Sequence, residues 1–203
     1  DMVQTKGFDK PYPKGGIPYF KGNKMSISQL NWLVETLKNI PDDYAVSVIS
    51  HTVPADEYVG LTPINAKLSD ANINQDLLAG IMIAFQDSSS YVGQSNLNSS
   101  LFSSYDMSAY EGTISVDFSG HIKDRVAVWT YGHFHDYGHT TKQENGRFNF
   151  IQNPNLVGKT WGFIGDIRSC QFQTQIIDTT KRKVHVVRFA PSAGRDKEFT
   201  LTY

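Results

Sequence analysis

The chain has 203 residues, enough to bury a substantial core, and we predict a single domain over 1–203. Nineteen Lys and Arg residues balance twenty Asp and Glu residues, so the bulk charge does not indicate a nucleic-acid partner. No apolar run approaches the ~20 residues that a membrane-spanning helix requires, and a single cysteine, Cys170, excludes a disulfide within the chain. We therefore expect a soluble protein whose compartment is open. The chain begins with Asp1 rather than Met, and a processed product or a fragment of a longer protein is one interpretation of that start.

The first half of the chain predicts two helices and one strand. Ser26 offers a hydroxyl N-cap, and apolar residues at i, i+3, i+4 and i+7 from Leu30 predict an amphipathic helix that ends at Pro41. Residues 45–50 form an apolar run that predicts a short buried strand. Residues 73–85 again show helical spacing of apolar side chains and predict a core-facing helix.

The second half predicts strands. Residues 86–105 are dense in Ser, Asn and Gly, which predicts a long loop at a rim, with a disordered linker as the alternative. The expected strands are an edge strand over 113–118, a buried strand over 126–131, the second arm of a hairpin over 147–152, and two further strands over 172–177 and 184–189. This pattern indicates the α/β class, with mixed β-sheets flanked by helices.

Histidines follow two of the predicted strands directly. The strand over 126–131 leads into Gly132, His133, Phe134 and His135, and the strand over 45–50 leads into His51. Side chains spaced i, i+2 along extended chain point the same way, and neutral imidazoles are common metal ligands. A metal site is one interpretation of His133 and His135; a surface pair or hydrogen-bonded core histidines are the alternatives.

The order of these motifs resembles the carboxyl-terminal half of the calcineurin-like metallophosphoesterases. Residues 29–33 (Gln-Leu-Asn-Trp-Leu) precede a strand that ends at Ser50-His51, and a later strand ends at Gly132-His133-Phe134-His135. The ending, with paired strands and then residues 188–199, is also similar. The resemblance covers about residues 26–54 and 126–203, and it implies part of an αββα sandwich.

The resemblance implies a metal role for three histidines. His51 and His133 match two ligands of one divalent cation, and His135 matches a ligand of a neighbouring one. The cation would be Mn, Fe, Zn or Ni, and the substrate a phosphomonoester or phosphodiester attacked by metal-activated water. A site left without metal in this chain alone is the alternative.

Other parts of the family pattern are missing. The family uses an early Asp-x-His, a Gly-Asp whose carboxylate bridges the ions, and a Gly-Asn-His that supplies the leaving-group acid. Gly165-Asp166 comes too late in the chain to match the bridging Gly-Asp. Gly22-Asn23 does not match Gly-Asn-His, because Lys24 follows it. Three imidazoles without a carboxylate make at most a single three-histidine site. We therefore expect little activity from this chain alone, and self-association or pairing with an amino-terminal half.

The competing hypothesis is a degenerate, non-catalytic module used for binding or assembly, as in a surface or phage-like structural protein. Metallo-β-lactamase and cupin patterns fit the His-x-His less well. His139 could be a fourth ligand, but we favour the interpretation as an exposed loop histidine. We interpret His121 and His185 as structural. Upstream Asp-x-His, Gly-Asp and Gly-Asn-His motifs in the gene would favour the enzyme. An extracellular or phage-associated location stays open.

Overall fold

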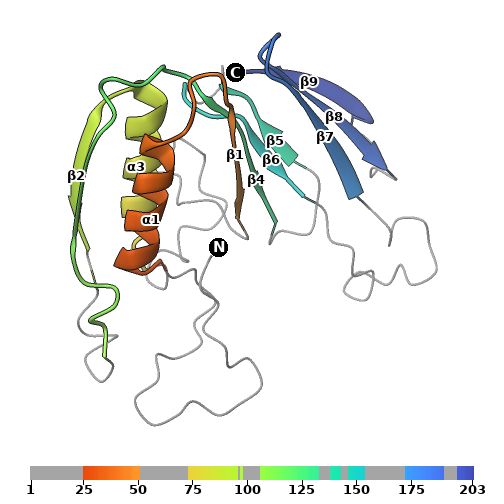
Figure 1. Cartoon of the computed structure of the whole chain (residues 1–203). Coiled ribbons are helices and arrows are strands. Elements are labelled where there is room, and N and C mark those ends of the chain that lie inside the picture. The colour runs from red at the N-terminus through yellow and green to blue at the C-terminus, as the bar shows by residue number, and fades with distance from the viewer. Residues whose placement is uncertain are drawn as a thin grey trace, which may run out of the picture. The chain divides into compact units, whose positions relative to one another are not determined.

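The computed structural model describes residues 25–50, 73–95, 97, 106–132, 138–142, 146–153, 172–189 and 196–203. These residues form a mixed α/β structure with two helices and three β-sheets, so the predicted α/β class is confirmed (Figure 1). Two compact units contain these elements: α1, α3, β2 and β3 in one, β1 and β4–β9 in the other. The single-domain organisation of 1–203 stays a prediction, and each unit is described by itself.

Helix α1 (Ile27–Lys38) forms where the sequence predicts it. Ser26 is the N-cap: its Oγ accepts a hydrogen bond from the Gln29 backbone N–H at 3.2 Å, and the Gln29 side chain accepts one from the Ser26 N–H at 3.3 Å. This reciprocal capping box satisfies two amide groups that a helix start leaves without partners. The helix buries Leu30, Val34 and Leu37, and it ends before Pro41, as the apolar spacing indicates.

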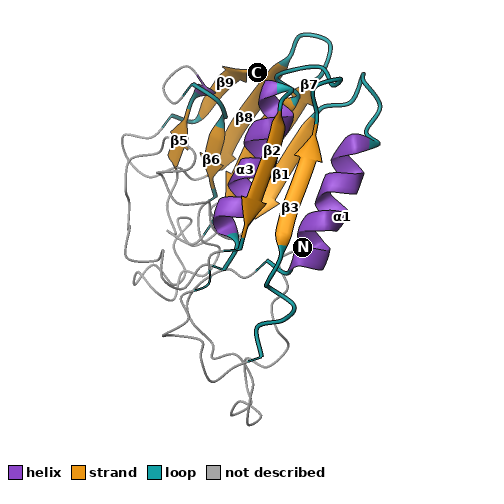
Figure 2. Ribbon diagram, turned by 90° about the vertical axis from the view of Figure 1, so that its left-hand side faces the viewer, coloured by secondary structure: helices purple, strands orange, loops and turns teal. Residues whose placement is uncertain are grey.

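Helix α3 (Gln75–Asp87) carries the second predicted apolar stripe, and its buried face packs on a two-stranded sheet (Figure 2). Strand β2 (Ser90–Gln94) pairs antiparallel with β3 (Thr113–Asp117), which confirms the predicted edge strand near 113–118. The prediction of a loop over 86–105 is wrong for β2. Its inward positions are Tyr91 and Gly93, and a glycine at one of two inward positions conceals the period-two apolar pattern from the sequence.

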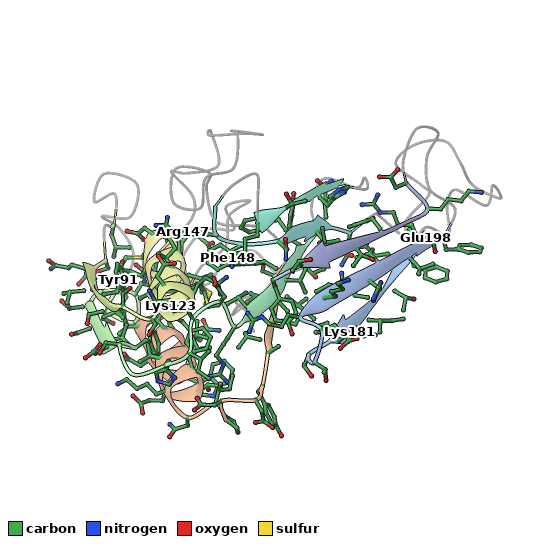
Figure 3. The ribbon with its side chains drawn as sticks, turned by 90° about the horizontal axis from the view of Figure 1, so that it is seen from above. Tyr91, Lys123, Arg147, Phe148, Lys181 and Glu198 are labelled. Atoms are coloured by element: carbon green, nitrogen blue, oxygen red, sulfur yellow. The ribbon has the colours of Figure 1, made fainter. Side chains whose placement is uncertain are left out.

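Tyr91 packs against helix α3, beside which Figure 3 shows it. A Cβ atom added to Gly80 of α3 would lie 2.1 Å from the Tyr91 Cζ, and one added to Gly93 would lie 2.1 Å from its Oη. Real Cβ contacts are not that close, so both glycines leave the space that the ring occupies. The Tyr91 ring therefore fills the space between Gly80 of α3 and Gly93 of β2.

The start of α3 is fixed by a buried asparagine. Asn74 has left-handed backbone angles (φ 61°, ψ 26°), and its Nδ2 donates to the carbonyl oxygens of Met25 at 2.8 Å and Tyr110 at 2.9 Å. Asparagine tolerates this conformation better than most residues. One side chain thus joins three segments of this unit.

The other unit contains a four-stranded sheet in the order β1 (Val46–Ser50), β4 (Val126–Tyr131), β6 (Phe150–Gln152) and β5 (Gly138–Thr140). β1, β4 and β6 are parallel, and β5 is antiparallel to β6, which confirms a hairpin ahead of residue 152. β4 is buried throughout, as predicted. The buried strand predicted over 45–50 is wrong in its burial, because β1 is an edge strand and Ile49 is 80% exposed.

A three-stranded antiparallel sheet packs on one face of this sheet. It contains β7 (Phe172–Asp178), β8 (Lys183–Phe189) and β9 (Glu198–Thr202); the first two are predicted, and the third is not. The core between the sheets includes Val128, Ile151, Val184, Val186 and Leu201. β4 and β6 are therefore the two central strands of the four-stranded sheet, and both contribute residues to this core. In the ranges described, no helix is long and apolar enough to cross a membrane.

Candidate functional site

Three parallel strands of the second unit end in one row. Ser50 at the end of β1 is the register partner of Tyr131 at the end of β4, and Tyr131 is the partner of Gln152 at the end of β6. Parallel strands place their carboxyl ends at one edge of a sheet, and ligands of α/β proteins commonly bind there. We call Ser50, Tyr131 and Gln152 the edge row.

The three histidines predicted as metal ligands, His51, His133 and His135, lie outside the described residues. In the sequence, His51 directly follows Ser50, and His133 is the second residue after Tyr131. Convergence of their imidazoles therefore stays a prediction. Elsewhere, in the parts of the chain that the structure does describe, no three His, Cys, Asp or Glu side chains group closely enough to hold a metal ion.

Described residues flank the positions of His133 and His135 in the sequence and belong to this sheet. Tyr131 ends β4 before them and Gly138 begins β5 after them, and both Tyr131 and Gly138 are register partners of Gln152. β4 and β5 are thus the two strands beside β6.

Side chains on one face hold the edge row together. The Trp129 Nε1–H donates to the Ser50 Oγ at 2.8 Å, and the Tyr131 hydroxyl donates to the Gln152 Oε1 at 3.3 Å. The indole of Trp129 is fully buried and packs against the ring of Phe150, with centroids 5.8 Å apart. A buried indole with its N–H satisfied gives β1 and β4 a defined register at this end.

On the opposite face, a chain of polar side chains connects this edge to β7. The Thr130 Oγ1 donates to the Gln175 Oε1 at 3.1 Å, and the Gln173 Nε2 donates to the Asn153 Oδ1. The Asn153 N–H donates to the Tyr131 carbonyl at 2.6 Å, which extends the β4–β6 connection one residue past β6. Sequence analysis did not identify these amides. The sequence contained a signal for them, because Gln173 and Gln175 are spaced i, i+2 in a predicted strand and so lie on one face of it.

The edge row itself is uncharged. It offers two hydroxyls and an amide, with a glycine at the fourth strand, and it contains no carboxylate. Away from the edge row, at the β7–β8 turn, the Lys181 backbone N–H lowers the pKa of the Asp178 carboxyl. A cation at the edge row would consequently need its charged or imidazole ligands from the segments that follow the strands.

The other histidines have separate environments. His121 lies against the rings of Phe85 and Phe118, with centroid distances of 5.9 and 5.5 Å, as its structural interpretation implies. His185 is on β8, where its Nδ1 is 2.8 Å from the Thr200 Oγ1. The expectation of a loop position for His139 is wrong: it is exposed, but it lies on strand β5 and stacks on a ring of β9.

No family model, curated protein or solved structure matches the chain.

Proposed function

We propose that the chain is the carboxyl-terminal part of a metal-dependent phosphoesterase, with His51, His133 and His135 as metal ligands. The observation that supports this most is the edge row, because two strands far apart in sequence end side by side and each is followed by a predicted ligand. Ends that lay at opposite edges of the sheet would have removed the basis for a shared site.

The short separation of each histidine from a strand end supports this argument. His51 is one peptide step from Ser50, and His133 is two steps from Tyr131. Ser50 and Tyr131 are register partners on paired strands, and such strands lie ~4.8 Å apart. The two predicted ligands thus follow neighbouring strand ends, although 81 residues separate them in sequence.

The proposed chemistry follows the resemblance to the metallophosphoesterases. One divalent cation would be bound by His51 and His133, and a neighbouring one by His135, with Mn, Fe, Zn or Ni as candidates because each accepts imidazole ligands. Two cations about 3.5–4 Å apart clamp the oxygens of a phosphate ester and activate water. Residues 1–203 lack the bridging carboxylate and the acid of the family, so an amino-terminal part would have to supply both.

Strand β1 is the proposed contact for that amino-terminal part. In the described residues its one strand neighbour is β4, and Ile49 on its surface is 80% exposed. The outer edge of such a strand presents N–H and C=O groups that can template further pairing. An added strand at β1 would bring its own residues beside the edge row.

The uncharged edge row also favours a second candidate. A degenerate module would keep the sheet and lose the carboxylates, and it would act in binding or assembly. The two candidates differ in whether the chain binds metal at all. Metal content therefore distinguishes them before any substrate is known.

The test measures Zn²⁺ and Mn²⁺ binding to the full chain by calorimetry and by metal analysis after dialysis. We expect saturable binding that the triple variant His51→Ala, His133→Ala, His135→Ala abolishes, whereas the matched control His185→Ala, at an exposed position of β8, retains it. Unchanged binding in the triple variant would contradict the proposed ligands. No binding by the wild-type chain would favour the degenerate module.

Aryl phosphate hydrolysis with added Mn²⁺ is the second measurement. We expect activity at least about 10²–10⁴-fold below that of an intact enzyme, because a positioned acid–base group alone contributes that factor. A full rate from residues 1–203 would contradict the inferred need for an amino-terminal part. The triple histidine variant must abolish any activity that is found.

A further inference from the structure

We propose that the outer edge of strand β7 is the docking site for a second copy of this chain. The two β7 strands would pair antiparallel about a twofold axis at Thr174, so that the three-stranded sheets of both copies become one continuous sheet. This inference does not depend on the proposed metal site.

The edge of β7, whose one strand neighbour among the described residues is β8, differs from the edges at β9 and β5. β9 at the opposite edge of the same sheet carries Glu198, and β5 has three residues. Charge and short length are features that protect sheet edges from further pairing. Residues 172–177 of β7 contain no charged residue, no glycine and no proline, and β7 pairs with β8 without a register shift.

The surface beside this edge is apolar. Ile176 is 56% exposed and Val187 is 47% exposed, and both lie on the outer face together with Phe172 and Phe189, whose rings stack with centroids 4.8 Å apart. The opposite side chains, Gln173 and Gln175, are engaged within the unit. The outer face of β7 and β8 thus exposes four large apolar side chains beside the polar Thr174 and His185, and a cluster of exposed apolar side chains is a feature of interaction surfaces.

The sequence of β7 fits a second copy of itself. With Thr174 opposite Thr174 of the partner, Phe172 of each copy lies opposite the partner's Ile176. Aromatic residues opposite β-branched residues and Thr opposite Thr are favourable cross-strand pairs. In this register Asp178, which is the one charged residue of the strand, lies beyond the paired segment.

The same register makes the contact self-complementary. A twofold axis brings identical patches together, as an isologous dimer requires. Phe172 stacks on Phe189 of its own copy and contacts the partner's Ile176, so two such apolar rows would cross the interface. This twofold self-complementarity favours a second copy of the chain over a strand of another protein or of an amino-terminal half.

Sedimentation of the full chain over a range of concentrations tests the proposal. We expect a monomer–dimer equilibrium, and loss of the dimer in Thr174→Lys because like charges directly opposite each other destabilise a strand pair. Thr202→Lys, at an exposed position on β9, is the matched control and should leave the dimer intact. Circular dichroism should show both variants folded.

A cross-link tests the register. Residues directly opposite in an antiparallel pair have Cα atoms about 4.5–5.5 Å apart, which a disulfide can bridge. In a Cys170→Ser background, Thr174→Cys should form a disulfide-linked dimer under mild oxidation, and Thr202→Cys should not. A chain that stays monomeric, or a dimer that Thr174→Lys leaves intact, would overturn the proposal.

Discussion

Gly80 provides a direct test of how the first unit packs. Helix positions normally favour alanine over glycine by about 1 kcal/mol, so Gly80→Ala should stabilise an open helix. Here the added Cβ would lie 2.1 Å from the Cζ and 2.3 Å from the Cε2 of Tyr91. The ring must therefore move off α3, and its contact with the helix is lost.

The two effects have opposite signs. Overpacking costs about 1–3 kcal/mol, against the gain of about 1 kcal/mol in helix propensity. We expect Gly80→Ala to lower the free energy of unfolding by about 1 kcal/mol, because the ring is half-buried and can partly relax. In a Tyr91→Ala background the ring is absent, so Gly80→Ala should instead raise the free energy of unfolding.

Urea unfolding of four proteins measures this coupling: wild type, Gly80→Ala, Tyr91→Ala and the double variant. A non-additive pair isolates the contact between the two positions. Gly120→Ala is the matched control, since a Cβ there meets nothing within 4 Å, and it should change stability little. Stabilisation by Gly80→Ala with Tyr91 present, or additive effects, would refute the packing argument.

Three further predictions concern single polar contacts. Asn74→Ala should cost about 2–3 kcal/mol in urea unfolding, because it removes two buried hydrogen bonds to backbone carbonyls and retains the left-handed backbone; Asn74→Gly, which relieves the backbone, should cost less. Ser50→Ala should cost about 1–3 kcal/mol by leaving the buried Trp129 N–H without its acceptor, and an unchanged unfolding midpoint would contradict that bond. The Lys181 N–H holds the pKa of the Asp178 carboxyl below its ordinary value. The Asp178 carboxylate therefore stabilises the fold above the unfolded pKa of about 3.9, and this contribution is lost as the pH falls through the folded pKa. Asp178→Asn should lower the thermal midpoint at pH 7 and match the wild type in strong acid.

Elements whose pattern is local were predictable from sequence. Helix α1 combines an N-cap with an apolar stripe, and β7 and β8 are two alternating runs joined by a short polar turn. In each case the information lies within about a dozen residues. The left-handed Gly146 (φ 80°) at the predicted turn ahead of β6 belongs to the same class.

Elements whose pattern depends on distant partners were not. Gly93 replaces an apolar side chain in β2 because the Tyr91 ring needs the space, and β9 alternates weakly behind a polar segment. The burial of β1 was overestimated for a related reason. An apolar run has the same appearance at the centre and at the edge of a parallel sheet, and Ile49 could not show which applies.

The candidate site combines both kinds of information. A strand end followed by histidine is a local feature of the sequence. The pairing of β1 with β4 is not local, because parallel strands are joined by a long crossover and hydrophobic periodicity does not specify which strand is the partner. The in-register pair Ser50 and Tyr131 supplies that missing relation.

The edge row also limits what the site can be. The edge row contributes hydroxyls and an amide that hold the strands in place, so any charge needed for catalysis must come from the segments beyond the strands or from a partner at β1. A variant that weakens the edge row, such as Ser50→Ala, should therefore affect folding stability first, and metal binding only through the positions of the segments that follow.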